Sequence, residues 1–185
     1  MSITLLPNEI LGTIFDGLSN VHDRVALAST CRQMHGAATY SSIPHIVRSE
    51  YDMNLVIEHR ATRVCINVRI DVPLGALHHI THLTIRVPDF EIPALPPNLV
   101  YLCVQTHTNL PQLPPTLREL YCCSNSMAVL PPLPLTLHTL YCPGNRLTVL
   151  PYLPPILSTL DCGVNNLAYL PPLPDTLKIL DCSGN

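Results

Sequence analysis

The sequence predicts an α+β protein in which a small helical module precedes a solenoid of short parallel strands. Three observations carry this prediction. Residues 117–185 repeat themselves every twenty residues, prolines recur at fixed positions inside each repeat, and residues 5–38 instead place apolar side chains at helical spacing. One such repeat is too small to bury its own apolar face, so neighbouring repeats must stack and share one core.

Each repeat contains the pattern L-x-x-L-x-C-x-x-N, which produces three columns of identical residues. The columns are Leu120, Leu140, Leu160 and Leu180, then Cys122, Cys142, Cys162 and Cys182, then Asn125, Asn145, Asn165 and Asn185. The pattern resembles that of leucine-rich repeats, which implies a short parallel strand in each turn. The leucines and cysteines are expected to be buried, and each asparagine amide to bond backbone groups of its own and the adjacent turn.

A second phrase, Leu-Pro-x-Leu-Pro, follows each strand at residues 130–134, 150–154 and 170–174. Proline fixes φ and favours an extended, polyproline-like path, which predicts a proline-rich extended convex side without helices. This unit is similar to the twenty-residue repeats of bacterial effector proteins and large-DNA-virus proteins. Some of those effectors carry a separate catalytic ubiquitin-ligase domain, and no segment of this chain is long enough to form one.

Three weaker copies of the repeat precede residue 117. Their core positions are Ala61, Val64 and Ile66, then Ile80, Leu83 and Ile85, then Leu99, Leu102 and Val104. The repeats are therefore expected to occupy residues 61–185 as about seven turns, of which the last is incomplete. In one turn His107 replaces the repeat asparagine. No polar capping segment follows Asn185, so we expect a shortened chain, a partner that covers Leu177 and Leu180, or self-association.

Residues 1–45 form a different unit, in which three short helices are expected. Pro7 and Glu9 suit the first turn of a helix, because proline is tolerated there and an acidic side chain favours the positive end of the helix dipole. The apolar residues that follow at helical spacing are Ile10, Leu11, Ile14, Phe15 and Leu18. Asn20 or Asp23 is placed to cap a second helix, and Met34 falls in a third.

These N-terminal residues resemble the F-box family in Leu6-Pro7, Glu9, the apolar helix, Asp23 and the Cys31-Arg32 pair. Met34 stands where the family often has tryptophan. The resemblance implies docking on the Skp adaptor of a cullin–RING ubiquitin ligase. The docking residues that it implies are Leu6, Pro7, Ile10, Ile14 and Leu18. Residues 46–60 then form a connector, in which residues 47–57 are expected to add one more helix under the repeats.

The outward side chains of the strands are expected to form a concave face, the surface with which repeat proteins usually bind partners. The candidate substrate-binding residues are Tyr101, Glu119, Tyr121, Tyr141, Asp161 and Asp181. Tyr121 is expected to lie over Tyr141, with Tyr101 nearby, as an aromatic anchor. The alternative is that tyrosine simply suits a β surface.

Composition argues against several classes of function. The net charge is −3, and no basic patch marks a nucleic-acid interface. Prolines and polar residues interrupt every apolar run before it reaches the roughly 20 residues of a membrane span, so neither nucleic acid nor membrane is an expected partner. The first residues lack the features of a signal peptide, and the expected location is cytoplasmic or nuclear, in a host cell if the source is viral or bacterial.

No catalytic set, metal site or cofactor is expected. A straight column of cysteine sulfurs does not supply the tetrahedron that zinc requires, and cysteine often serves as a small buried hydrophobe. His78, His79 and His82 are the one cluster of histidines, and they are interpreted as the solvated edge of an early repeat rather than as metal ligands. The chain is therefore not expected to be an enzyme.

Two functions fit this organisation. The first is a substrate adaptor of an SCF-type ubiquitin ligase, in which the F-box binds the Skp adaptor, and through it a cullin, while the repeats hold an unknown target protein. The second is a leucine-rich-repeat interaction module unconnected with ubiquitin, in which the F-box-like helices cap the N-terminal end of the repeats. The second function predicts no binding to Skp.

Overall fold

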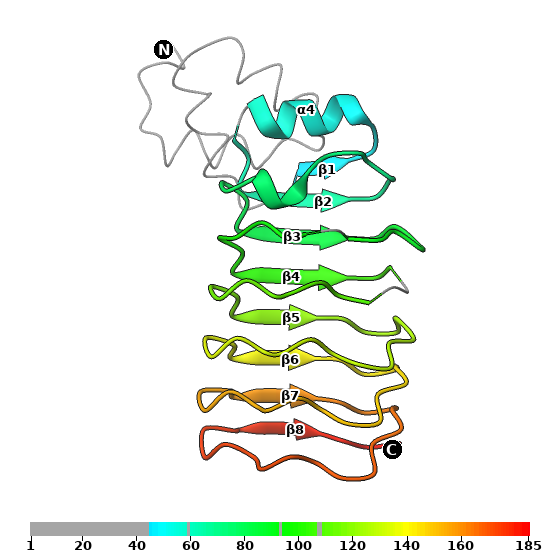
Figure 1. The fold of residues 1–185 in the computed structure, drawn as a ribbon, viewed down its shortest axis with the longest axis vertical. Coiled ribbons are helices and arrows are strands. Elements are labelled where there is room, and N and C mark those ends of the chain that lie inside the picture. Colours follow the sequence, from blue (N-terminus) through cyan, green and yellow to red (C-terminus); the bar gives the residue numbers. More distant parts are fainter. Residues whose placement is uncertain (1–44, 59, 93, 107–108) are drawn as a thin grey trace, which may run out of the picture.

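A computed structural model describes residues 45–58, 60–92, 94–106 and 109–185, which form one stack of turns (Figure 1). The three helices expected before residue 45 lie outside the described residues. The elements, in chain order, are β1 His45–Val47, α4 Glu50–Glu58, β2 Arg63–Ile66, the 3₁₀-helix η2 Leu74–Ala76, β3 His82–Ile85, β4 Tyr101–Val104, β5 Glu119–Tyr121, β6 Thr139–Tyr141, β7 Thr159–Asp161 and β8 Ile179–Asp181.

The strands form one eight-stranded parallel sheet in chain order. Strands β2 to β8 are the seven strands of the predicted repeats, and the repeat leucines are in register, Leu120 with Leu140 and Leu140 with Leu160. The predicted parallel solenoid is thus confirmed. Strand β1 is an additional strand, paired in parallel with β2, in a segment where the sequence shows no repeat.

Helix α4 confirms the helix expected in the connector, although it begins at Glu50 because Val47 belongs to β1. The Ser49 hydroxyl accepts a hydrogen bond from the Asp52 N–H (3.1 Å), and the Asp52 carboxylate accepts one from the Arg48 N–H (2.9 Å). The first bond satisfies an N–H group in the first turn of the helix, and the second ties the residue before the cap to the helix. Met53 and Val56 are fully buried, so α4 covers the N-terminal end of the core.

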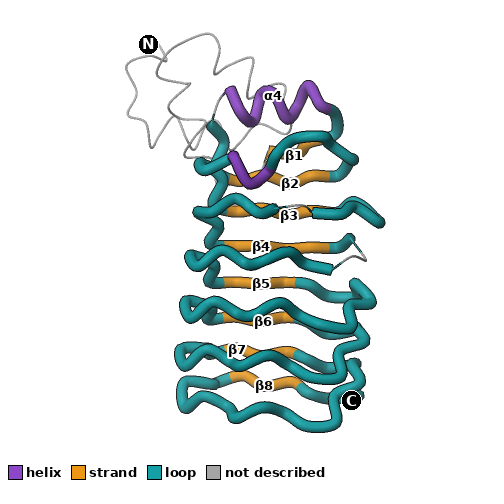
Figure 2. Tube along the Cα trace, viewed as in Figure 1, coloured by secondary structure: helices purple, strands orange, loops and turns teal. Residues whose placement is uncertain are grey.

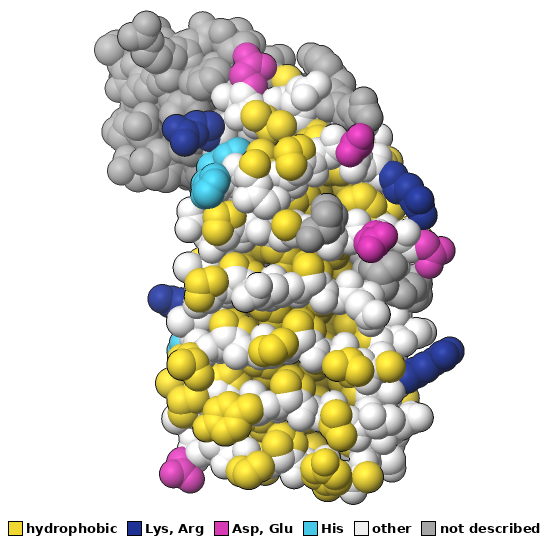
Figure 3. All heavy atoms as spheres, viewed as in Figure 1, with side chains coloured by type: hydrophobic (Ala, Val, Ile, Leu, Met, Phe, Trp, Pro, Cys, Tyr) yellow, Lys and Arg dark blue, Asp and Glu magenta, His cyan; other side chains and the backbone are white. Residues whose placement is uncertain are grey.

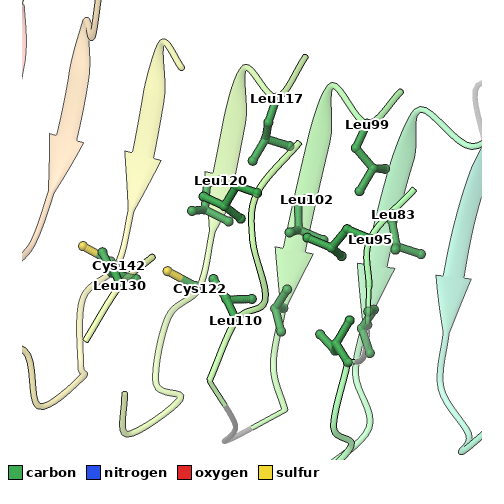
Figure 4. Close-up of a cluster of buried hydrophobic side chains, with 14 of the residues drawn as sticks. Leu83, Leu95, Leu99, Leu102, Leu110, Leu117, Leu120, Cys122, Leu130 and Cys142 are labelled. Carbon is green, nitrogen blue, oxygen red and sulfur yellow. The ribbon is translucent and has the colours of Figure 1, made fainter. Parts of the chain in front are cut away.

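The core lies between the sheet and the segments that return from one strand to the next, here called the return segments (Figure 4). Leu137, Leu140 and Cys142, the three inward positions of one turn, are 0% exposed. Fully burying one such leucine contributes roughly 1.5–3 kcal/mol, so each added turn stabilises its neighbours. The inward positions of the predicted pattern are therefore confirmed.

The described return segments after η2 contain no helix (Figure 2). Each ends in a tight turn in which a proline carbonyl accepts the N–H of the first core leucine, as Pro134 does from Leu137 (3.0 Å) and Pro154 from Leu157 (3.0 Å). A proline carbonyl is available for such a bond, whereas the ring fixes φ and removes a competing donor. The predicted extended, proline-rich side is confirmed.

The asparagine column forms a ladder of buried hydrogen bonds. The Asn145 amide donates to the Cys122 carbonyl (2.8 Å) in the preceding turn and to the Cys142 carbonyl (3.0 Å) in its own turn. Its Oδ1 accepts from the backbone N–H groups of Asn125 and Met127, both at 3.1 Å. Because these backbone groups are buried, each would be costly to leave unpaired. The predicted role of the asparagines is confirmed.

The cysteine column is buried in part. Cys122, Cys142 and Cys162 are 0% exposed, as predicted. The prediction is wrong for Cys182, which is exposed because it follows β8, the last strand of the sheet, and no further turn packs on it. Leu180 is 41% exposed for the same reason, whereas Leu160 is fully buried. What covers this end of the sheet stays a prediction.

Candidate functional site

The sheet face that points away from the core, here called the outer sheet face, is the expected concave side. Strand register arranges its side chains in two columns. The first column is Arg63, His82, Tyr101, Glu119, Thr139, Thr159 and Ile179. The second column is Cys65, Thr84, Cys103, Tyr121, Tyr141, Asp161 and Asp181. All six predicted substrate-binding residues lie in these columns, and this placement makes the outer sheet face the candidate site.

Four rings on this face form one continuous pile, here called the aromatic stack. The ring centroids of His82 and Tyr101 are 5.8 Å apart, those of Tyr101 and Tyr121 are 5.3 Å apart, and those of Tyr121 and Tyr141 are 5.2 Å apart. Parallel strands lie about 4.8 Å apart, so rings on successive strands are held at the distance that favours aromatic pairing. The arrangement of Tyr121 over Tyr141, with Tyr101 nearby, is as predicted.

His82 joins this site, whereas the sequence suggests a solvated cluster of His82 with His78 and His79. Its position in the repeat frame, in register with Tyr101, is the signal that identifies it. The stack also crosses from the first column to the second between Tyr101 and Tyr121, where the inter-ring angle opens to 36°. The repeat pattern predicts only which residues share a column. The contact between the rings of Tyr101 and Tyr121, which belong to different columns, depends on the size of the side chains.

Burial on the sheet favours the uncharged forms of Tyr101, Tyr121 and His82. Burial, together with smaller effects of neighbouring groups, raises the pKa of Tyr101 to about 12. Burial followed by the nearby Glu119 carboxylate raises the pKa of Tyr121 above its ordinary value. Burial and then the Arg63 charge lower the pKa of His82. The Tyr121 hydroxyl donates to Glu119 Oε2 (3.3 Å), which fixes the carboxylate beside the stack.

The C-terminal part of the face is acidic. Among the described residues of the two columns, β5 to β8 carry Glu119, Asp161 and Asp181 and no basic side chain. Asp161 Oδ1 accepts from the Gly163 N–H (3.1 Å). Asp181 Oδ1 accepts from the Ser183 N–H (2.9 Å) and hydroxyl (2.7 Å), and these bonds lower the pKa of Asp181. Both carboxylates are therefore oriented by hydrogen bonds within their own turns.

The other candidate chemistry does not assemble into a site. Within the described ranges no three His, Cys, Asp or Glu side chains are grouped so that they could hold a metal ion. Cys65 and Cys103 lie on the outer sheet face, and Cys123 follows β5. Burial raises the pKa of each thiol, which disfavours the reactive thiolate. His79 lies elsewhere, with its Nε2 buried and without a hydrogen-bond partner.

Two shallow hollows lie away from the outer columns. One of about 470 Å³ is lined by Arg69, Ile70, Asp71, Asp89, Phe90 and Glu91. Another of about 350 Å³ is lined by Ala94, Leu95, Pro97, Pro111, Gln112, Leu113, Pro114 and Pro115. Neither of these two hollows contains a residue of the aromatic stack.

The return segments carry a second surface, of exposed apolar side chains, that the sequence pattern does not predict. Exposed apolar side chains gather over the C-terminal turns on the face shown in Figure 3. Exposed apolar residues of the return segments include Leu135 (68%), Tyr152 (72%) and Leu173 (43%). The extended return path turns these side chains outward, whereas their leucine-rich composition suggests a core.

The predicted Skp-binding residues, Leu6, Pro7, Ile10, Ile14 and Leu18, lie outside the described residues. Among the helices that the structure does describe, none combines the length and apolarity needed to cross a membrane.

Comparison with known proteins supplies further evidence. Residues 3–43 match the F-box-like family model. YopM from Yersinia enterocolitica WA-314 is similar over 66% of this chain, with 28% identity and a TM-score of 0.51. YopM from Yersinia pestis, described as a leucine-rich effector protein, is similar over 66% of this chain, with 30% identity and a TM-score of 0.55. No curated protein matches the chain.

The matched region spans 27% and 36% of those two YopM chains, so the similarity concerns the repeats and not a whole protein. It agrees with the parallel sheet, the asparagine ladder and the extended return segments described above. The chain therefore carries an F-box-like domain at its N-terminus, followed by a leucine-rich-repeat solenoid that resembles the repeats of YopM.

Proposed function

We propose that the chain is a substrate-recognition adaptor of an SCF-type cullin–RING E3 ubiquitin ligase. The observation that carries this proposal is the combination, in one chain, of an F-box-like match at residues 3–43 with a solenoid whose outer face bears an aromatic stack. F-box domains in general dock on a Skp-type adaptor. A repeat surface in general binds a macromolecular partner.

In this proposal the two parts of the chain have separate roles. Leu6, Pro7, Ile10, Ile14 and Leu18 contact the Skp-type adaptor, which holds the chain beside a cullin. The outer sheet face holds the target protein through Tyr101, Glu119, Tyr121, Tyr141, Asp161 and Asp181. We include His82 in this surface because its ring stacks on Tyr101. The chain positions the target, and the ligase supplies the chemistry of ubiquitin transfer, so no catalytic residue is assigned.

The rival role, in which the F-box-like helices only cap the repeats, is less well supported. A cap covers an apolar core that would otherwise face water. Here β1 and α4 already extend the array, and Met53 and Val56 of α4 are fully buried against the core. Residues 45–58 thus cover the N-terminal end of the core, so a capping role is not needed to explain the F-box-like match.

The similarity to a leucine-rich effector protein supports a proposed site of action inside a eukaryotic cell. Skp-type adaptors and cullins belong to the cytoplasm and nucleus, and we propose that the chain acts in the cytoplasm or nucleus of such a cell.

The proposed docking surface is tested by Pro7→Ala in the full chain. Pro7 is expected at a helix start, where its replacement changes little packing. The affinity for a purified Skp-type adaptor, measured by isothermal titration calorimetry, is expected to fall. Pro132→Ala, at an exposed proline of a return segment, is the matched control and leaves that affinity unchanged. Full affinity in Pro7→Ala, and then in Leu6→Ala with its fold verified by circular dichroism, contradicts the assigned surface.

A further inference from the structure

The aromatic stack stops at Tyr141 although its column continues. In the second column the residue in register with Tyr141 is Asp161, and the next is Asp181. Within the described part of the chain no further ring contacts Tyr141 beyond Tyr121. The ring face of Tyr141 that is turned away from Tyr121, here called the terminal face, therefore borders a short carboxylate instead of another ring.

The geometry of the stack fixes what shape fits against this terminal face. The rings of Tyr121 and Tyr141 are nearly parallel, with an interplanar angle of 8° and a centroid distance of 5.2 Å. The next strand lies about 4.8 Å further along the solenoid, which is the spacing of one more planar group. Asp161 is too short to fill that layer, and its Oδ1 is bonded to the Gly163 N–H of its own turn. A planar group from a partner fits the layer above it.

Charge specifies the chemistry of that planar group. The layer is bordered by Asp161 and is next to Asp181, and a Cβ added at Gly163 would lie 3.5 Å from Asp161 Oδ1 and 3.4 Å from Asp181 Oδ1. The two carboxylates thus lie close together beside Gly163, and Asp161 is in register with Tyr141. A cation over a tyrosine face is attracted by the ring, and a guanidinium is planar, carries several N–H donors and pairs well with carboxylates.

We propose that the terminal face of Tyr141 and the carboxylates of Asp161 and Asp181 together receive an arginine side chain of the target protein. The guanidinium stacks on Tyr141 as the next layer of the aromatic stack and donates N–H bonds to Asp161. This inference rests on the proposed function only in taking the bound molecule to be the target. A lysine ammonium has no plane to stack, and an apolar side chain would leave the carboxylates without a partner.

The opposite end of the stack supports this assignment. There the residue in register with His82 is Arg63, so the neighbouring strand carries a positive charge at this end. The Arg63 charge is close enough to lower the pKa of His82, after the larger effect of burial. The two ends of the stack therefore differ in charge, and a positively charged side chain of the target is directed to the Asp161 end.

The test uses the full chain with ¹³C-labelled tyrosine and three small probes. Nα-acetyl-arginine amide is titrated while the Tyr141 ring resonances are followed by NMR, and Nα-acetyl-citrulline amide and Nα-acetyl-lysine amide serve as comparison probes. Citrulline has nearly the shape of arginine without its charge. The arginine probe is expected to shift the Tyr141 ring resonances, with binding about fivefold or more tighter than either comparison probe.

Two variants locate the site. Asp161→Asn keeps an Oδ1 acceptor for the Gly163 N–H, so the turn is retained, and it is expected to weaken binding of the arginine probe about fivefold or more. Asp175→Asn removes an exposed carboxylate on a return segment and is the matched control, with no expected change. Tyr141→Leu removes the stacking face and is also expected to weaken binding.

The inference is overturned if the arginine and citrulline probes bind equally. It is also overturned if Asp161→Asn binds as wild type does, or if the Tyr141 resonances stay unmoved up to the solubility limit of the probe. These outcomes are independent of the adaptor role. A chain that binds a Skp-type adaptor but not the arginine probe retains the adaptor role and loses this site, and the reverse result retains the site and removes the adaptor role.

Discussion

At the scale of single residues, the asparagine column does more for the solenoid than its polar character suggests. Asn165 repeats the contacts of Asn145, donating to the Cys142 and Cys162 carbonyls (both 3.0 Å) and accepting from the Leu147 N–H (3.1 Å). Each amide therefore joins two turns in the buried interior of the solenoid. A buried asparagine of this kind stabilises because its removal would leave several backbone groups unpaired.

Asn145→Ala is accordingly expected to lower the free energy of unfolding by about 3 kcal/mol or more, because four backbone partners lose their hydrogen bonds. Urea denaturation followed by circular dichroism measures this change. Asn166→Ala alters an exposed neighbouring asparagine and is expected to stay within about 0.5 kcal/mol of wild type. Equal stability of the two variants would show that the ladder does not hold the turns together.

The buried thiols make stability depend on alkaline pH. Burial raises the pKa of Cys122 from 9.0 to about 12 and that of Cys162 to about 11, and it raises the pKa of Cys142 as well. Since the folded chain binds these protons more tightly than the unfolded chain, their contribution is complete below about pH 9 and is lost as the pH rises towards 12.

The free energy of unfolding is therefore expected to decline from pH 9 to pH 11, and Cys142→Val is expected to make this decline shallower. That substitution is also expected to cost less than about 1.5 kcal/mol at pH 7, because valine is a small apolar replacement. Urea denaturation at several pH values tests both statements. An identical pH profile in wild type and Cys142→Val would contradict the role of the buried thiol.

At the scale of elements, the turn before each strand carries a second ladder. The hydroxyl of Thr136 donates to the carbonyls of Pro115 (2.6 Å) and Leu117 (2.8 Å) in the preceding turn. Thr116 and Thr176 make the same pair of bonds to their preceding turns. Ile156 occupies this position in the remaining turn and is 38% exposed. Among these four turns the series of threonine bonds is therefore interrupted once, at Ile156. The preceding turn still offers the carbonyls of Leu135 and Leu137 as acceptors.

Ile156→Thr is expected to raise the free energy of unfolding by about 1 kcal/mol, because the introduced hydroxyl reaches the carbonyls of Leu135 and Leu137 in the same geometry. The reverse change, Thr136→Ile, is expected to lower it by a similar amount. Thermal or urea denaturation of both variants provides the comparison. The proposed ladder fails if the two substitutions shift stability in the same direction.

The sequence predicts the repeated elements well and the unrepeated ones less well, for physical reasons. Strands β2 to β8 follow from residues that recur at fixed spacing, since only one register buries every leucine of a column. Strand β1 is three residues long and is stabilised by pairing with β2, so no local pattern marks it. The start of α4 is set by the Ser49 and Asp52 side chains rather than by hydrophobic spacing.

The candidate site shows the same limit. The columns of the outer sheet face follow from the repeat, and they contain every predicted substrate-binding residue. The contact between Tyr101 and Tyr121 does not follow from it, because their backbones are out of register and only the reach of two large rings brings them together. The continuity of the stack from His82 and Tyr101 to Tyr121 depends on that contact.

At the scale of the whole molecule, recognition and ligase docking are proposed to lie on separate surfaces. Changing Tyr121 and Tyr141 together to Ala is expected to weaken binding of the target protein by about 2 kcal/mol or more, as for other aromatic anchors, and to leave binding of a Skp-type adaptor unchanged. Calorimetric or interferometric titration with each partner measures the two affinities. Both side chains lie on the outer sheet face, far along the chain from residues 3–43.

Changing Tyr152 and Tyr169 together to Ala provides the matched control, because these tyrosines are 72% and 67% exposed and neither belongs to the aromatic stack. Their loss is expected to leave target binding unchanged. The opposite result is that the double substitution of Tyr152 and Tyr169 weakens target binding, while that of Tyr121 and Tyr141 has no effect. In that case the target binds the exposed apolar surface of the return segments, and the assignment of the outer sheet face is wrong.

The most direct measurement of the central claim is recovery of the ligase by the chain itself. Affinity-tagged wild-type chain is incubated with a eukaryotic cell lysate, and the co-purified proteins are quantified by mass spectrometry beside the Pro7→Ala variant. The adaptor role predicts that a Skp-type adaptor and a cullin co-purify with wild type and are depleted with Pro7→Ala. Recovery of neither protein with a folded wild-type chain would contradict the adaptor role and leave a repeat protein whose F-box-like segment serves another purpose.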